Sequence, residues 1–334
     1  MRDSFVAIRA AILAMALGLP WMAGCGTAGR PPAFALTREP WDFHGARGAR
    51  LLSTHFDVRT TVEDAKVVDV LPQFLETCYR RCTELIPPRR PAGDPLATYV
   101  FNTRGQWMRF TDDFVPDRAP LYRNIQSGGY TDQPTATSVL YWIGRDRTLA
   151  VASHESWHQY VARHLPLAIP PWLNEGLATQ FEAFELRDGV PVFEPRKNYF
   201  RRNYLREALI AKENGLYGLP ELLRMHAGDV FDSRRRPPDT YYAQVWSLTL
   251  FLLEGPNRAY REGFRTLLAE AGTESMRVAV SGYTAATPAA AGLSFGEIVF
   301  RRYIAENLDR FSAEYVEYAK ELVRGTPRPG TFPW

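Results

Sequence analysis

The sequence predicts an α+β fold, with a strand-containing N-terminal lobe over residues 41–145 and a helical C-terminal lobe over residues 146–330. Runs of β-branched and aromatic residues, which are typical of strands, fall mainly before residue 146. Apolar residues at helical spacing dominate after it. The 334 residues are 46% hydrophobic, which is enough for one large domain or two packed subdomains. We therefore expect residues 41–330 to form one unit with a cleft between its two lobes.

The N-terminal residues have the pattern of an export signal. Basic residues precede an apolar run over residues 10–22, which has the length of a signal-peptide core and is too short for a membrane span. The run ends in Met22-Ala23-Gly24-Cys25, which resembles the lipobox of bacterial lipoproteins, although its first residue stands where Leu is usual. The resemblance implies removal of residues 1–24 and a lipid on Cys25, which would anchor the chain in the bacterial cell envelope. The alternative is a cleaved form that is periplasmic or secreted.

In the first lobe, strands are expected where β-branched and aromatic residues cluster, and helices where apolar residues recur every three or four positions. Residues 25–40 carry Gly, Pro and Thr without periodicity and are expected to be a tether. Strands are expected over residues 51–62, 97–101 and 137–143. Helices are expected over residues 61–85, bent or restarted at Pro72, and around residues 106–111. A proline-rich loop over residues 87–95 and a glycine-marked turn over residues 127–130 separate these elements.

Two cysteines lie four residues apart on the apolar face of the helix expected over residues 61–85. An exported protein could pair Cys78 with Cys82. The four-residue helical spacing gives poor disulfide geometry, so two buried thiols are an equal alternative. Neither interpretation bears on function.

The second lobe is expected to be helical apart from one hairpin. The first helix covers residues 148–165 and ends at Pro166, and the second covers residues 172–184 after Pro170 and Pro171. Asp188-Gly189 is a strong hairpin turn between two short strand-like segments. Further helices are expected over residues 198–212, 220–226, 241–254, 258–271, 294–307 and 311–323.

The segment HESWH (residues 154–158) has the spacing of two metal ligands on one helix. Residues four apart lie about 40° apart around a helix and about 6 Å apart along it, so two imidazoles can reach one ion. Glu155 is then placed to activate a water molecule bound to the metal. Val151, Val161 and Leu165 share the stripe of His154 and His158, which therefore faces inward. The alternative is a pair of core histidines that are satisfied by hydrogen bonds.

A carboxylate in the next helix favours the metal interpretation. Glu175 follows His158 within PPWLNEGLATQFE, and Pro166 allows the second helix to return beside the first. A Glu ligand leaves the fourth coordination position to water, which is the arrangement of a catalytic zinc site. Glu182, on the same face of the expected helix, either orients a ligand imidazole or is a solvated helix acid.

HESWH followed by WLNEGLA resembles the gluzincin metallopeptidases, which include thermolysin and the aminopeptidase-N-like enzymes. The mature chain is similar, over about residues 50–325, to a family of exported bacterial peptidase-MA-like proteins. The resemblance implies a thermolysin-like catalytic domain with one Zn²⁺ in a cleft between the lobes, held by His154, His158 and Glu175. It also places Tyr242, in Tyr242-Ala243-Gln244, where aminopeptidase-N-like enzymes have a tyrosine that stabilises the oxyanion. The other interpretation is that Tyr241 and Tyr242 pack under the site.

The segment Gly128-Gly129-Tyr130 either forms an ordinary turn or contributes the edge of a cleft, to which a peptide adds as a strand. The remaining histidines, His44, His55, His164 and His226, lack ligand spacing and are expected to be structural or exposed.

The expected function is zinc-dependent hydrolysis of peptide bonds in the cell envelope or outside the cell, with Glu155 as general base. The alternative is a non-catalytic, zinc-stabilised lipoprotein that binds peptides, and an ester or epoxide substrate also stays open. The net charge of +3 and the absence of a basic stripe with interleaved aromatics argue against a nucleic-acid partner. Membrane attachment is expected only through a lipid on Cys25, and the oligomeric state stays open.

Overall fold

The computed structural model describes residues 34–125, 128–211, 215–226, 229 and 236–324. The expected signal peptide (residues 1–24), Cys25 and the tether up to residue 33 lie outside the described residues. From Ala35 onward the described residues belong to one compact unit. Within this described part, no helix has both the length and the apolar character that a membrane span requires.

A six-stranded mixed sheet organises the first half of the chain, with strand order β1-β2-β3-β4-β6-β5. The neighbouring strands β3, β4 and β6 are parallel, and the other pairs are antiparallel. The strands are β1 (Thr37–Phe43), β2 (Ala46–Leu52), β3 (Phe56–Thr60), β4 (Leu96–Phe101), β5 (Gly129–Asp132) and β6 (Thr137–Tyr141). The expectation of a mixed α and β fold is confirmed. Within the described sheet, β1 and β5 are the two edge strands.

Two expectations about the first strands are wrong. Residues 51–62 form parts of two antiparallel strands rather than one, because the chain turns after Leu52 and Ser53 N donates to Phe56 O at 2.9 Å. Residues 37–40, expected in the tether, begin β1, which pairs with β2 along its length. Pro40 made this segment look like a loop, but a strand at the edge of a sheet tolerates a proline.

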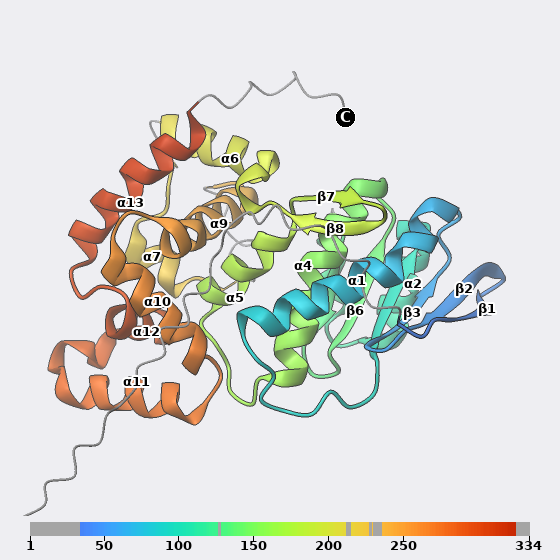
Figure 1. The fold of residues 1–334 in the computed structure, drawn as a ribbon, viewed down its shortest axis with the longest axis horizontal. Helices are drawn as coiled ribbons and strands as arrows, with labels where there is room; N and C mark the ends of the chain where they lie inside the picture. Colours follow the sequence, from blue (N-terminus) through green and yellow to red (C-terminus); the bar gives the residue numbers. More distant parts are fainter. Residues whose placement is uncertain (1–33, 126–127, 212–214, 227–228, 230–235, 325–334) are drawn as a thin grey trace, which may run out of the picture. The chain divides into compact units, whose positions relative to one another are not determined.

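Helices α1 (Ala65–Leu85) and α4 (Arg145–His164) pack against each other on one face of the sheet. Helix α2 (Arg104–Phe114) lies on the other face, where Trp107 Nε1 donates to the carbonyl oxygen of Val139 in β6 at 2.9 Å. A short helix α3 (Ala119–Tyr122) follows it. In Figure 1, the strands lie to the right and α7 and α10 to α13 lie to the left, with α5 between them.

Helix α1 is continuous through Pro72, so of the two expected outcomes, a bend or a restart, the restart is wrong. Pro72 removes one backbone hydrogen bond, but Leu71, Phe74 and Leu75 around it are buried, and this packing favours the helix. Cys78 and Cys82 of this helix are free, buried thiols rather than a disulfide. Burial raises the pKa of the Cys78 and Cys82 thiols above the ordinary value.

The second half is helical apart from the β7–β8 hairpin. The hairpin turn is formed by Asp188 and Gly189, which have φ values of 52° and 77°, as the sequence predicts. The elements are α5 (Pro171–Ala178), η1 (Thr179–Phe181), β7 (Phe184–Arg187), β8 (Val190–Phe193), η2 (Pro195–Lys197), α6 (Tyr199–Ile210), α7 (Leu219–Arg224), α9 (Pro238–Glu254), α10 (Arg258–Glu270), α11 (Glu274–Ala286), η3 (Pro288–Gly292), α12 (Phe295–Tyr303) and α13 (Leu308–Val323).

Two differences from the expected helices have physical causes. The helix expected over residues 172–184 ends at Ala178 and tightens into η1, so Glu182 lies beyond the helix. Helix α11 was not predicted, because Met276 is its one buried residue and no apolar stripe marks it in the sequence.

Helix α4 joins the two halves, although the sequence placed it in the helical lobe. It packs against α1, β5 and β6 on one side and against α5 on the other. Helix α5 in turn packs closely on α9 at Gly176, where an added Cβ would lie 2.2 Å from Thr249 Oγ1. This close contact requires glycine next to Glu175 and fixes the position of α5 relative to α9.

Candidate metal centre

Three ligand atoms from α4 and α5 converge at one point. His154 Nε2 and His158 Nε2 lie 3.1 Å apart, and Glu175 Oε2 lies 3.3 Å and 3.5 Å from them. Three donors about 2.0–2.1 Å from a tetrahedral ion would be separated by about 3.3–3.4 Å, close to these distances. All three side chains are buried, and the group could hold a metal ion. The structure therefore brings together the three ligands that the sequence predicts.

The charges of this group also favour a bound cation. Glu175 Oε2 is buried and makes no hydrogen bond within the described structure, although a buried carboxylate without a partner is costly. Burial opposes ionisation of Glu175, but the two nearby imidazoles outweigh it and lower the carboxyl pKa. Burial likewise opposes a charge on His154, but the carboxylates of Glu175 and Glu182 raise its pKa to about 10. A metal ion would replace that proton, so metal binding and proton release are linked.

Each ligand imidazole is oriented through its other nitrogen. His154 Nδ1 donates to Glu182 Oε1 at 2.9 Å, as one of the two interpretations of Glu182 predicted. His158 Nδ1 donates to Asn174 Oδ1 at 3.3 Å, and this oxygen also accepts a hydrogen bond from Trp157 Nε1 at 2.9 Å. Such partners fix each ring so that its Nε2 faces the point where the three candidate ligand atoms converge. Sequence reasoning missed Asn174, although its place directly before Glu175 could have indicated it.

Glu182 reaches His154 from the end of η1 and is held by several donors. Asn198 Nδ2 donates to its Oε2 at 2.8 Å, and Arg201 donates to both carboxylate oxygens. Burial opposes ionisation of this carboxyl, but Arg201 and His154 lower its pKa to about 2. Glu182 is therefore a fixed anion beside His154 rather than a solvated helix acid.

Glu155, the expected general base, is 8% exposed and is held by the edge strand β5. Thr131 Oγ1 in β5 donates to Glu155 Oε2 at 2.7 Å. The Thr131 hydroxyl lies 2.8 Å from Ser138 Oγ in the paired strand β6. Sequence reasoning missed Thr131, because no local pattern in the sequence indicates that β5 passes beside Glu155.

Gly128, directly before β5, and Gly129, its first residue, explain how this strand approaches α4. Gly128 has φ of 99°, and an added Cβ would lie 2.5 Å from Cγ2 of Val151 in α4. An added Cβ at Gly129 would lie 2.5 Å from the carbonyl oxygen of Val139. Tyr130 packs against Trp107 in an apolar cluster separate from the main core. The segment therefore leads into an edge strand beside Glu155, and Ser127 lies outside the described residues.

The two tyrosines at the start of α9 differ in their relation to the metal group. The Tyr242 ring centroid lies 6.2 Å from that of His154, and the Arg201 guanidinium lies 4.9 Å from the Tyr242 ring. Burial raises the pKa of the Tyr242 hydroxyl well above its ordinary value, so the hydroxyl stays protonated and neutral. Tyr241 is fully buried, and its hydroxyl makes no hydrogen bond within the described structure.

The other histidines do not join His154, His158 and Glu175. His55 Nδ1 pairs with Glu76 at 2.7 Å, and His164 Nδ1 bonds to the carbonyl oxygen of Arg90. His44 and His226 are exposed.

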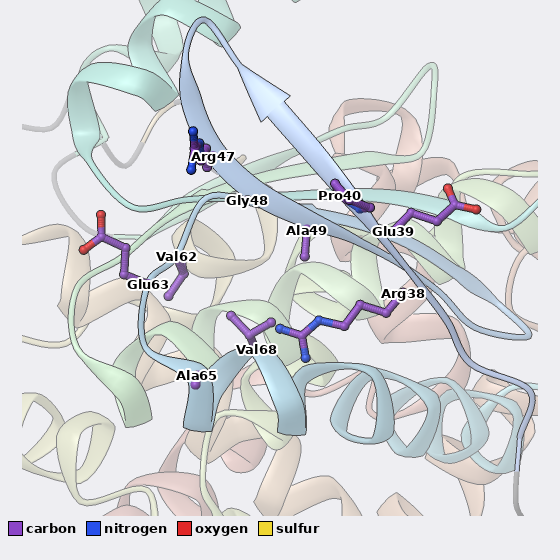
Figure 2. Close-up of a pocket in the computed structure, with 10 residues that line it drawn as sticks. All are labelled: Arg38, Glu39, Pro40, Arg47, Gly48, Ala49, Val62, Glu63, Ala65 and Val68. Carbon is purple, nitrogen blue, oxygen red and sulfur yellow. The ribbon is translucent and has the colours of Figure 1, made fainter.

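A cavity of about 460 Å³ lies between the β1–β2 hairpin and the start of α1, with Arg38, Arg47 and Val68 in its lining (Figure 2). None of its lining residues belongs to the metal group.

Comparison of the chain with protein-family models, with curated proteins and with solved structures finds no significant match.

Proposed function

We propose that this chain is an exported zinc metallopeptidase of the gluzincin type, with a thermolysin-like catalytic unit. The observation that carries the proposal is the triangle of His154 Nε2, His158 Nε2 and Glu175 Oε2, with sides of 3.1–3.5 Å. Two imidazoles and one carboxylate are a ligand set that suits zinc and leaves a position open. When bound, zinc supplies Lewis acidity, which polarises a carbonyl group and makes water more acidic.

The protein's own residues supply the remaining steps. Glu155 takes the proton from the attacking water and passes it to the leaving amine. Thr131 holds the Glu155 carboxylate at 2.7 Å, and such an anchor suits a base that must stay in one position. Tyr242 donates a hydrogen bond to the oxygen on which negative charge develops. The carboxylate of Glu155 is not one of the three converging ligands, which favours catalysis over a purely structural metal site.

The position of β5 supports a peptide as the substrate. This strand is at an edge of the sheet, and its Thr131 contacts the proposed general base. The outer edge of β5 has no partner strand in the described sheet. An extended peptide could pair with it through main-chain hydrogen bonds, which would place a peptide bond beside Glu155.

The decisive experiment compares Glu155→Gln with the wild type, using a broad peptide library with and without a chelator. We expect the variant to keep one zinc ion per chain and to lose about 10²- to 10⁴-fold in kcat, the usual contribution of a general base. The exposed Glu63→Gln is the matched control and should cleave like the wild type. Cleavage by Glu155→Gln at the wild-type rate would refute the assigned base. A wild type that binds peptides and zinc without cleaving them would support the non-catalytic alternative.

Export as a lipoprotein is part of the same proposal. It rests on the apolar run and Met22-Ala23-Gly24-Cys25 in the sequence. Mass spectrometry of the mature N-terminus should find an acylated Cys25, and a mature chain that retains residues 1–24 would contradict the proposal.

A further inference from the structure

Arg201, in the first turn of α6, lies largely buried beside Glu182 and uses all three of its side-chain nitrogens. Its side chain is 12% exposed. Arg201 Nε and Nη2 donate to the two oxygens of Glu182 at 2.8 Å and 2.7 Å. Arg201 Nη1 donates to Asp239 Oδ1 at 3.0 Å. A guanidinium with this two-pronged contact fixes the Glu182 carboxylate in one orientation.

The same guanidinium contacts the proposed oxyanion donor. It lies 4.9 Å from the ring centroid of Tyr242, within the range of a cation–π interaction. Asp239 and Tyr242 are three residues apart on α9, so they lie on neighbouring positions of one helix face. Arg201 therefore holds the first turns of α9 at two points, by an ion pair and by a ring contact.

Arg201 also balances the charge behind the metal ligand. His154 lies between the carboxylates of Glu182 and Glu175, at 2.9 Å and 3.3 Å. The positive charge of Arg201 balances the negative charge of the Glu182 carboxylate, which stays ionised and accepts the hydrogen bond from His154 Nδ1. Without Arg201, the Glu182 carboxylate would be buried with His154 and Asn198 as its remaining partners, and an incompletely paired buried anion is costly.

We propose that Arg201 is a positioning residue for both halves of the site. It orients the metal ligand His154 through Glu182, and it holds Tyr242 in place through the ring contact and Asp239. Lysine cannot replace it, because an ammonium group is a point charge that lacks the planar fork and the stacking face. The inference rests on the proposed function for the role of Tyr242. The part that concerns metal affinity does not depend on hydrolysis.

The first measurement is zinc affinity by competition with a chromogenic chelator. We expect Arg201→Lys to weaken zinc binding by about 10- to 100-fold, the range for residues that orient a ligand. Glu182→Gln should give a similar loss, and the double variant should lose little more than either single variant, because both act through His154. Arg202→Lys, on the next position of α6, is the matched control and should bind zinc like the wild type. Unchanged zinc affinity in a folded Arg201→Lys would overturn the inference, as would full additivity with Glu182→Gln.

The second measurement separates the effect on Tyr242. At saturating zinc, Arg201→Lys should lower kcat about 10-fold or more in the wild-type background and have little effect in the Tyr242→Phe background. Equal losses in both backgrounds would contradict the coupling to Tyr242.

Asp239→Asn removes the ion pair between Arg201 and α9 and leaves the Arg201–Glu182 contacts in place, so it should lower kcat without changing zinc affinity. It provides the test if Arg201→Lys does not fold, and normal kcat in this variant would contradict the role of the ion pair. Absence of hydrolysis in the wild type would refute the proposed function but leave the zinc-affinity result valid.

Discussion

Helix α4 carries three buried histidines in two different surroundings, one shared by His154 and His158 and the other around His164. His154 and His158 share their space with the carboxylates of Glu175 and Glu182. His164, at the end of the same helix, is 1% exposed and has a neutral partner for each ring nitrogen. Its Nδ1 donates to the carbonyl oxygen of Arg90 at 3.0 Å, so its Nε2 accepts from the Tyr79 hydroxyl at 2.9 Å.

The difference shows how a structure distinguishes a candidate metal centre from a core histidine whose hydrogen bonds are satisfied. At His164 every donor meets an acceptor, so the neutral ring needs nothing further. At His154 and His158, two nitrogens and one carboxylate oxygen face a common point, and the oxygen makes no hydrogen bond within the described structure. In the described part of the chain, this group alone brings three ligand atoms so close. Both sites are buried, and what separates them is that His154, His158 and Glu175 point three metal-binding atoms at one place and that carboxylates surround the imidazoles.

Removing one histidine from each group should give the largest contrast. His158→Ala removes a ligand, so zinc affinity should fall by more than the roughly 100-fold typical of a residue that only orients a ligand. His164→Ala should keep zinc and lose stability, because it leaves the Tyr79 hydroxyl and the Arg90 carbonyl unpaired at about 1–3 kcal/mol each. Chelator competition and urea unfolding measure the two effects. If His164→Ala lost zinc and His158→Ala bound zinc normally, the assignment of His158 as a ligand and of His164 as a core histidine would be contradicted.

A tyrosine lies beside each of these sites, Tyr242 next to His154 and Tyr79 next to His164. Loss of the first hydroxyl should affect kcat, and loss of the second should affect stability. Tyr242→Phe should lower kcat by about 10²- to 10³-fold, as loss of an oxyanion donor does, with little change in stability. Tyr79→Phe removes the hydrogen bond to His164 and should cost about 1 kcal/mol in unfolding free energy, without affecting kcat. Steady-state kinetics and chemical denaturation of both variants provide the check. If Tyr242→Phe changes stability alone, the Tyr242 hydroxyl has a structural rather than a catalytic role.

The smallest expected effect is the pH dependence of stability contributed by His164. Burial lowers the pKa of His164 below its ordinary value of 6.5, so the folded state favours the neutral ring. Its stabilising contribution is therefore present above pH 6.5 and falls as the pH decreases through 6.5, by at most about 1.4 kcal/mol per pH unit. Urea unfolding at about pH 7.5 and about pH 5.5 should show a smaller pH dependence in His164→Gln than in the wild type. Equal dependence in both proteins would assign the effect to other groups.

Much of the fold follows from local patterns. The helices expected at residues 258–271 and 311–323 are found as α10 and α13 with small changes at their ends, because their apolar stripes mark the buried face. The hairpin at Asp188-Gly189 follows from turn chemistry alone. The pairing of β1 with β2 and the early end of α5 could not be predicted, because each depends on what the segment meets in the folded chain.

In the candidate site, too, some features follow from local sequence and others depend on tertiary contacts. Its three ligands could be predicted because HESWH sets the spacing on one helix and WLNEG begins the next one. Their orienting partners could not be predicted so well. Thr131 precedes Glu155 by 24 residues, and Arg201 follows Glu182 by 19 residues, with strands or turns between them.

By itself, the sequence determined which side chains can bind a metal and which carboxylate stands beside them, because ligand chemistry and helical spacing are local properties. The tertiary structure alone decided that the donors converge within 3.1–3.5 Å, that Thr131 holds Glu155, and that Arg201 joins Glu182 to α9. These contacts join segments that are separate in sequence. They arise only when α4 is packed between the sheet and α5, and when α6 and α9 pack against each other beside it.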